Sequence, residues 1–159
     1  MVIDIDISDL PNTYLDVPSF NTKYGKEYDN SFSLIHFNCR RLHRNFDNLA
    51  LLLNEIKHKF KIIGLTETWL HSSSFIDAFQ FDGYNFLHSD RVNRRGGGTG
   101  LYIHKSLQHK FRSDLSVTCN SFESTFIEFE SVKCKKTVIG VIYRPPGQNV
   151  DELINYHVF

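Results

Sequence analysis

A carboxylate follows a short apolar run in the stretch KIIGLTETWL, residues 61–70. The run Ile62, Ile63 and Leu65 predicts a buried strand, and Glu67 stands just beyond it. A carboxylate removed from water is costly unless a cation, hydrogen bonds or bulk solvent compensates it. Mg²⁺ takes oxygen ligands, usually one or two protein carboxylates with water and phosphate oxygens. Glu67 is therefore a candidate metal ligand, and the alternative is a strand-end acid in solvent.

A second polar side chain, Asn38, ends the apolar segment FSLIHFN at residues 32–38. Between it and Glu67, residues 44–60 carry apolar side chains at helical spacing, which predicts an amphipathic helix. A strand, a helix and a strand in this order form a crossover unit, so we expect the two strands to be parallel in one sheet. Ligands in such architectures bind at the carboxyl ends of strands. We therefore expect Asn38 beside Glu67, joining or orienting the same site.

The segment KTVIGVIYRPPG, residues 136–147, predicts a strand that Pro145 and Pro146 end. Tyr143 and Arg144 stand at that end. A phenol can contact a phosphate there, and a guanidinium binds phosphate in a planar fork. The alternative is a tyrosine that caps the core and an arginine in water.

The glycine-rich segment RRGGGTG, residues 94–100, matches neither phosphate-loop pattern, and its glycines predict a tight turn before a strand. Arg91, Arg94 and Arg95 beside it are candidate contacts to a nucleic-acid backbone. A solvated basic loop is the alternative.

Composition indicates a globular chain of one domain, because the 159 residues are 41% hydrophobic and 14% aromatic. The net charge is zero, but residues 1–31 hold six acidic and two basic side chains and leave the rest at +4. We expect residues 1–31 to form a loosely ordered acidic arm and residues 32–159 to form the domain. A mildly basic domain is compatible with a nucleic-acid partner.

Localisation signals point to the interior of the cell. The three cysteines are an odd number without a C-x-x-C pair, which favours a reducing compartment, the nucleus or the cytoplasm. The N-terminus has acids within its apolar stretch, unlike a secretory signal. No apolar run approaches the roughly 20 residues that a membrane span needs, so we expect no membrane contact.

The remaining elements alternate between strand and helix patterns, which predicts a mixed α+β fold. Residues 72–81 indicate a short helical or irregular segment, and residues 150–159 indicate a helix with Asn149 as its cap. Further strands are expected at residues 83–91, Thr99–His104 and Thr125–Glu130.

Taken in order, FSLIHFNCRRL, FKIIGLTETWL, DGYNFLHSDRVNRRGGGTGLYI and VIGVIYRPPG resemble the first half of an endonuclease/exonuclease/phosphatase domain. The likeness covers about residues 32–155 and is strongest to the apurinic-type endonuclease domain of LINE-like (non-LTR) retrotransposon polyproteins, which also carry a reverse transcriptase. It implies a partial four-layer α/β/β/α sandwich of two stacked mixed sheets. It also implies metal-dependent phosphodiester cleavage, with Asn38 organising the site, Glu67 binding Mg²⁺ or Mn²⁺, and Tyr143 contacting the phosphate.

The same resemblance predicts a truncated active site. The family continues with an Asp-x-Asn strand, a late Asp and a Ser-Asp-His-like motif, which do not follow here. We therefore expect an N-terminal fragment of a DNA endonuclease that is inactive alone and binds its metal weakly. DNA would contact Arg91, Arg94, Arg95 and Arg144 through its phosphates. An apolar sheet face without its second half would be exposed and would promote self-association. The alternatives are a non-catalytic remnant that binds nucleic acid or protein, and a phosphatase-like relative.

Overall fold

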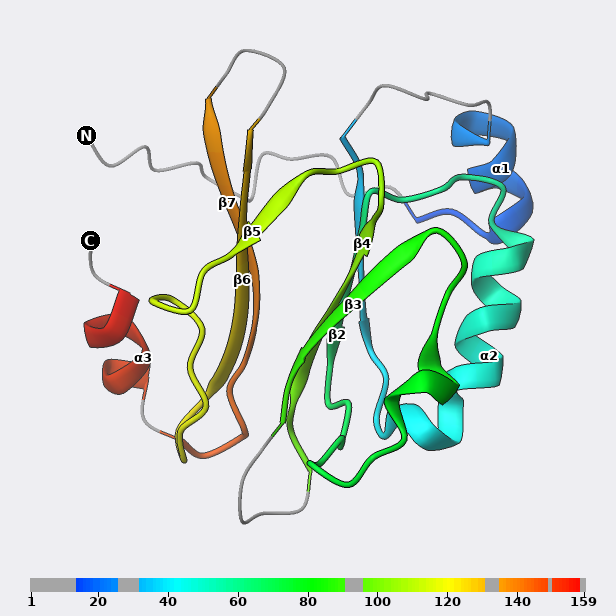
Figure 1. Ribbon diagram of the computed structural model, residues 1–159. Coiled ribbons are helices and arrows are strands. Elements are labelled where there is room, and N and C mark those ends of the chain that lie inside the picture. The colour runs from blue at the N-terminus through cyan, green and yellow to red at the C-terminus, as the bar shows by residue number, and fades with distance from the viewer. Residues whose placement is uncertain (1–13, 26–31, 91–95, 131–134, 149, 158–159) are drawn as a thin grey trace.

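Two β-sheets pack face to face, and helices lie on the outside of the pair (Figure 1). The structure, a computed structural model, describes residues 14–25, 32–90, 96–130, 135–148 and 150–157. This arrangement confirms the mixed α+β class and the layered sandwich predicted from the sequence. None of the helices in the described part of the chain is long and apolar enough to cross a bilayer.

The first sheet has four strands and carries the predicted crossover unit. In spatial order its strands are β1 (Leu34–Asn38), β2 (Ile62–Thr66), β4 (Thr99–His104) and β3 (Tyr84–Ser89). β1 and β2 are parallel, with Asn38 opposite Thr66, which confirms the predicted orientation. Helix α2 (Leu42–Glu55) connects them and lies on the outer face of this sheet (Figure 1).

The second sheet has three antiparallel strands. They are β5 (His109–Phe111), β6 (Glu123–Glu130) and β7 (Lys136–Tyr143). The short strand β5 was not predicted from the sequence. A 3₁₀-helix, η2 (Ile76–Phe79), leads toward β3, and helix α3 (Val150–His157) follows β7. Asn149, the predicted cap of α3, lies outside the described residues.

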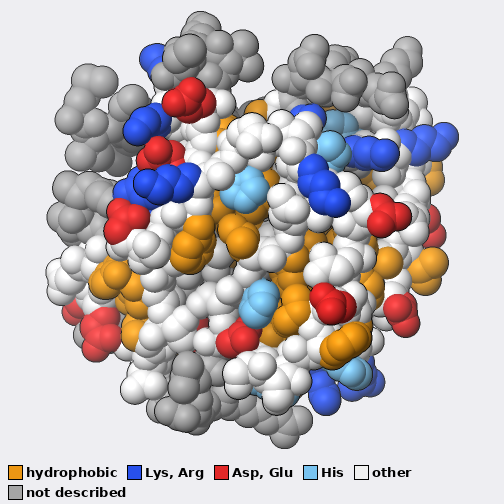
Figure 2. Space-filling model, in the orientation of Figure 1, with side chains coloured by type: hydrophobic (Ala, Val, Ile, Leu, Met, Phe, Trp, Pro, Cys, Tyr) orange, Lys and Arg blue, Asp and Glu red, His pale blue; other side chains and the backbone are white. Residues whose placement is uncertain are grey.

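The core between the sheets corrects one expectation. Its side chains are at most 7% exposed and come from both sheets: Ile62, Leu101, Ile103, Ile127, Phe129 and Val141. The apolar inner face that we expected to be exposed is therefore covered, because the β6–β7 hairpin folds over it. Hydrophobic side chains still reach the surface where β3 and β5 face each other (Figure 2). Self-association stays a prediction.

A second core lies between the first sheet and its helices. Tyr102 on β4 is fully buried there against Leu42 and Leu49 of α2, and its hydroxyl donates to the Phe79 carbonyl at 2.7 Å. All five residues of β2 are buried, because one face of the strand meets this core and the other meets the core between the sheets. The burial of β2 explains why its sequence lacks alternation.

Helix α1 (Val17–Tyr24) was not predicted, since residues 1–31 were expected to be a loosely ordered arm. The Asp16 carboxylate accepts from the Ser19 backbone N–H at 2.9 Å, and Pro18 occupies the first turn, where a missing N–H costs little. Phe20 packs against Phe60 with ring centroids 6.1 Å apart. The capping signal of Asp16 was present in the sequence, but the expected acidic arm did not take it into account.

Candidate active site

Three polar side chains meet at the carboxyl ends of β1, β2 and β7. Glu67 Oε1 accepts a hydrogen bond from Asn38 Nδ2 at 3.2 Å and a second from the Tyr143 hydroxyl at 3.1 Å. Asn38 and Glu67 belong to the first sheet, and Tyr143 belongs to the second. The structure thus brings together the three side chains singled out from the sequence. Their roles toward a metal and a phosphate stay predictions.

Tyr143 reaches Glu67 because the two sheets approach closely near this end. A Cβ on Gly64 of β2 would lie 2.7 Å from Val141 Cγ2 of β7, so only glycine lets the strands come this near. Val141 is buried in the core between the sheets, and Tyr143 follows it two residues later on the same face of β7. The close packing at Gly64 therefore allows the Tyr143 hydroxyl to come within hydrogen-bond distance of Glu67.

The amide of Asn38 is oriented by a backbone contact. The Arg40 N–H donates to Asn38 Oδ1 at 3.2 Å, which turns the Nδ2 group toward Glu67. The backbone after β1 is also tied to the backbone after β2. Cys39 N–H donates to the Thr66 carbonyl at 3.0 Å, and Arg41 N–H donates to the Glu67 carbonyl at 2.8 Å. These bonds extend the parallel ladder into the site.

The connections after β1 and after β2 contain residues with a strained backbone. Glu67 and Trp69 have φ of 54° and 55°, and Arg40 and Arg41 have φ of 44° and 83°. The left-handed region costs a non-glycine residue about 1 kcal/mol or more, and such residues cluster at binding and catalytic sites. The surrounding hydrogen bonds hold this geometry, so the Glu67 carboxylate is positioned before any ligand arrives.

The charge of Glu67 is not neutralised by the side chains that hold it, because an amide and a phenol are neutral donors. Within the described part of the chain, Oε2 carries no hydrogen bond. One half-buried carboxylate with a free oxygen fits a Mg²⁺ or Mn²⁺ ion that keeps most of its water. The described residues contain no cluster of three or more His, Cys, Asp or Glu that could enclose a metal. The donor set therefore fits a weakly held cation.

Cys39 lies next to this site but has the properties of a core side chain, as expected. It is 7% exposed, and its Sγ donates to the Thr66 carbonyl at 3.2 Å. Burial raises the pKa of the thiol to about 12, and the nearby Glu67 charge adds to the shift. A thiol with this pKa is protonated at neutral pH and is a poor nucleophile.

The predicted arginine contacts have different outcomes. Arg144 is exposed, and its Nη1 donates to the Gln148 carbonyl at 2.7 Å, so it closes the proline turn after β7. This local role was not predicted. Arg91, Arg94 and Arg95 lie outside the described residues. Contact of these four arginines with DNA stays a prediction.

Sequence reasoning missed a basic run directly after Asn38. Arg40, Arg41 and Arg44 are exposed and, within the described residues, form no ion pair. Their position after a strand that ends in a candidate site residue was the signal that could have found them. The run adds positive charge beside Glu67, where a phosphate would approach.

No family model matches the chain, and no curated protein matches it. Among solved structures, the AP endonuclease LMAP from Leishmania major is similar with a TM-score of 0.62 and 15% identity, over 91% of this chain and 49% of that protein. The human Nocturnin catalytic domain with bound sulfate has a TM-score of 0.49 and 12% identity, over 78% and 58%. The Xenopus laevis APE2 catalytic domain has a TM-score of 0.49 and 15% identity, over 79% and 49%.

The chain shares its fold with the corresponding part of the AP endonuclease LMAP. The chain spans about half the length of that protein. The layered α+β fold that the sequence resemblance implied is confirmed by the structure and by this likeness. At 15% identity, the likeness carries the fold alone.

Proposed function

We propose that the chain is the N-terminal part of a divalent-metal-dependent DNA endonuclease domain of a non-LTR retrotransposon. The observation that carries the proposal is the convergence of Asn38 and Tyr143 on one oxygen of Glu67, at 3.2 and 3.1 Å. A carboxylate held by neutral donors attracts a cation, and the cation attracts a phosphate.

The residues of this chain would bind and orient a DNA phosphate. Glu67 would hold the cation, Asn38 would fix the carboxylate, and the Tyr143 hydroxyl would contact a phosphate oxygen. Arg40, Arg41 and Arg44 supply the positive field for the strand. A bound divalent cation would neutralise charge that develops on the phosphate.

Two parts of the proposal rest on the sequence. The order of TETWL, RRGGG and YRPP supports the retrotransposon branch, and a reverse transcriptase reading frame in the same transcript would support it further. The described site has a single carboxylate, which supports the expected inactivity of this chain by itself. A positioned base and a group that stabilises the transition state each contribute about a hundredfold to ten-thousandfold, and Glu67 cannot serve as ligand and base together.

A manganese titration tests the metal site. We expect Mn²⁺ to bind in the millimolar range and to broaden NMR signals near Glu67 in the parent protein, because few protein ligands replace its water. Glu67→Gln should abolish this binding. The matched control is Glu130→Gln, which removes an exposed acid at the end of β6. Equal binding by the parent and Glu67→Gln contradicts the metal assignment.

Nicking of supercoiled plasmid with Mg²⁺ or Mn²⁺ tests activity. We expect no nicking above background by this chain alone. Nicking that disappears in Glu67→Gln would show a complete minimal nuclease and overturn the expected inactivity. Nicking that persists in Glu67→Gln identifies a contaminating enzyme.

A non-catalytic nucleic-acid-binding module is the second candidate, and the single carboxylate of the described site favours it. It predicts salt-sensitive DNA binding that does not depend on metal. Binding that is equal in parent and Glu67→Gln, with no manganese effect, would select this candidate over the first.

A further inference from the structure

A pocket of about 750 Å³ is lined by residues that follow Asn38 and Glu67 in the sequence, among them Arg41 and Trp69. We call it the Trp69 pocket. The residues that the argument uses are Arg41, His43, Trp69, His71, Phe75 and Phe79. They come from the connection after β1, the first turn of α2, the segment after β2 and η2. A pocket of this size is typical for small ligands.

The lining of the Trp69 pocket combines aromatic rings with positive charge. Phe79 is buried, Trp69 is half-buried, and Phe75 is 74% exposed, so its ring is accessible to a ligand. Arg41 and two histidines share the lining, and no described acidic residue lines it. Aromatic faces beside an arginine suit a ligand with a flat ring and an anionic group, as in a nucleotide.

The pocket and the Glu67 site are built from the same backbone. Arg41 N–H bonds the Glu67 carbonyl, and Trp69 N–H donates to the Gly97 carbonyl at 2.9 Å. Glu67 and Trp69 both have left-handed backbone and flank the buried Thr68. The strained turn therefore presents Glu67 to the strand edge and Trp69 to the pocket, and it fixes their separation.

This separation is short enough for neighbouring positions of one nucleic-acid strand to occupy both sites. Two residues of chain span at most about 7 Å, and stacked nucleotides rise about 3.4 Å each along a strand. A strand whose phosphate lies at Glu67 thus reaches Trp69 within one or two nucleotides.

We infer that the Trp69 pocket binds one unpaired nucleobase of a DNA strand, next to the phosphate held at Glu67. The base stacks on Phe75 within the pocket walled by Trp69, and Arg41 contacts the adjoining phosphate. The inference rests on the proposed function for its ligand, and it adds a site for an unstacked base beside the phosphate site. It implies a preference for single-stranded or distorted DNA over an intact duplex.

Trp69 reports on this pocket directly, because it is the only tryptophan of the chain. The probe is a hexamer of deoxyadenosine in EDTA, and the comparison ligand is a hexamer of base-free deoxyribose phosphate. We expect saturable quenching of tryptophan fluorescence by the first ligand and at least tenfold weaker quenching by the second. Because Phe75 would stack on one base, Phe75→Ala should weaken the affinity for the deoxyadenosine hexamer by about tenfold or more.

The matched control is Phe111→Ala, which removes another exposed phenylalanine on β5, at 46% exposure. It should leave the affinity unchanged, and circular dichroism should show both variants folded. Equal quenching by the two ligands, or an equal loss in both variants, overturns the inference. The manganese titration and the quenching assay on the parent protein separate the two proposals. Normal quenching without manganese binding contradicts only the metal site, and normal manganese binding without quenching contradicts only the pocket.

Discussion

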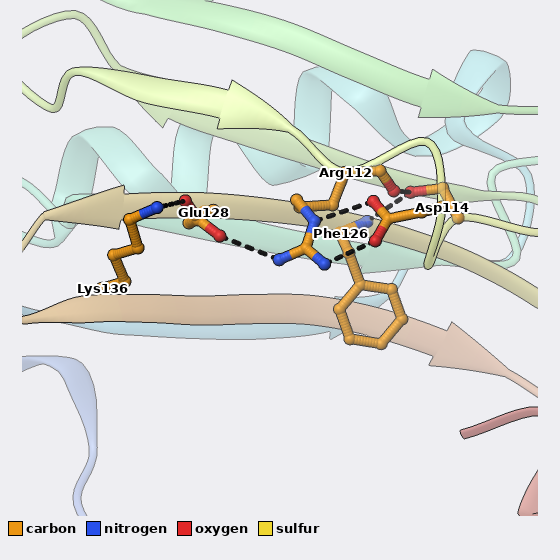
Figure 3. A network of polar contacts seen from close by, with 6 residues as sticks. Arg112, Asp114, Phe126, Glu128 and Lys136 are labelled. Atoms are coloured by element: carbon orange, nitrogen blue, oxygen red, sulfur yellow. Dashed lines mark hydrogen bonds and ion pairs between the residues drawn. The ribbon is translucent and has the colours of Figure 1, made fainter. Parts of the chain in front are cut away.

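Glu67 and Glu128 are two half-buried carboxylates in the same protein with opposite surroundings. Glu128 on β6 accepts from Arg112 Nη1 at 2.8 Å and lies 3.5 Å from Lys136 Nζ, and Arg112 also binds Asp114 (Figure 3). Among the described residues, the side chain of Glu67 is held only by an amide and a phenol. Basic side chains of the protein therefore compensate the charge of Glu128, whereas the two side chains bonded to Glu67 are neutral.

The comparison shows how to distinguish a binding carboxylate from a structural one. The ion pairs at Glu128 fasten β6 to the segment after β5 and to β7. At Glu67 the backbone is strained, with a φ of 54°, and the side-chain contacts orient the carboxylate without cancelling its charge. Strain and uncompensated charge reduce stability, so their presence together indicates function.

The largest effect is expected from changing the charge at position 38. Asn38→Asp adds a second carboxylate beside Glu67 and should strengthen manganese binding about tenfold, because affinity rises with ligand charge. Asn38→Lys gives Glu67 a cationic partner like that of Glu128 and should weaken binding about tenfold. Paramagnetic relaxation titrations measure both. A change in the same direction for the two variants would show that charge does not control the site.

A smaller effect is expected in the free energy of unfolding. Glu128→Gln removes the charge that joins Arg112 and Lys136, although Arg112 keeps Asp114, and should destabilise the protein by about 1 kcal/mol, discounted for partial exposure. Glu67→Gln keeps an acceptor for both neutral donors and should change stability by about 0.5 kcal/mol or less. Urea unfolding followed by circular dichroism gives both values. Equal losses would mean that Glu67 is also structural.

The phenol of Tyr143 should matter less than the charge at position 38. Tyr143→Phe removes one hydrogen bond to Glu67 and should cost about 1 kcal/mol of stability, with a change of manganese affinity of about threefold or less. Tyr84→Phe is the matched control, since its hydroxyl donates to the Phe60 carbonyl at 2.7 Å, away from the site. An altered manganese affinity in the Tyr84 variant would indicate an indirect effect.

The smallest effect concerns acid stability. The hydrogen bond from Arg112 lowers the pKa of Asp114 below its ordinary value of 3.8. Because the folded-state pKa is depressed, the stabilisation is complete above the unfolded value and is lost as pH falls through the folded value. Asp114→Asn should therefore make stability below about pH 4 depend less on pH. Asp82→Asn, an exposed acid without an ion pair among the described residues, should leave the profile unchanged.

Much of the fold could be predicted because its first half is local. The helical spacing of residues 44–60 between two apolar strands predicted α2 and the parallel pair β1–β2, and hence Asn38 beside Glu67. Thr99–His104 was predicted with the bounds of β4. The helix α1 was missed because residues 1–31 were expected to form a loosely ordered arm, and the strand β5 was missed because three residues are too few for a periodic signal.

The sequence by itself determined which side chains end the strands and which faces are apolar, since both follow from local order and periodicity. Only the tertiary structure decided what those faces meet. The contact of Tyr143 with Glu67, 76 residues apart, the closing of the second sheet over the first through Gly64, and the assembly of the Trp69 pocket from four segments all depend on non-local packing. Periodicity reports that a face must be covered, but the partner is selected by shape and volume once the whole chain has collapsed.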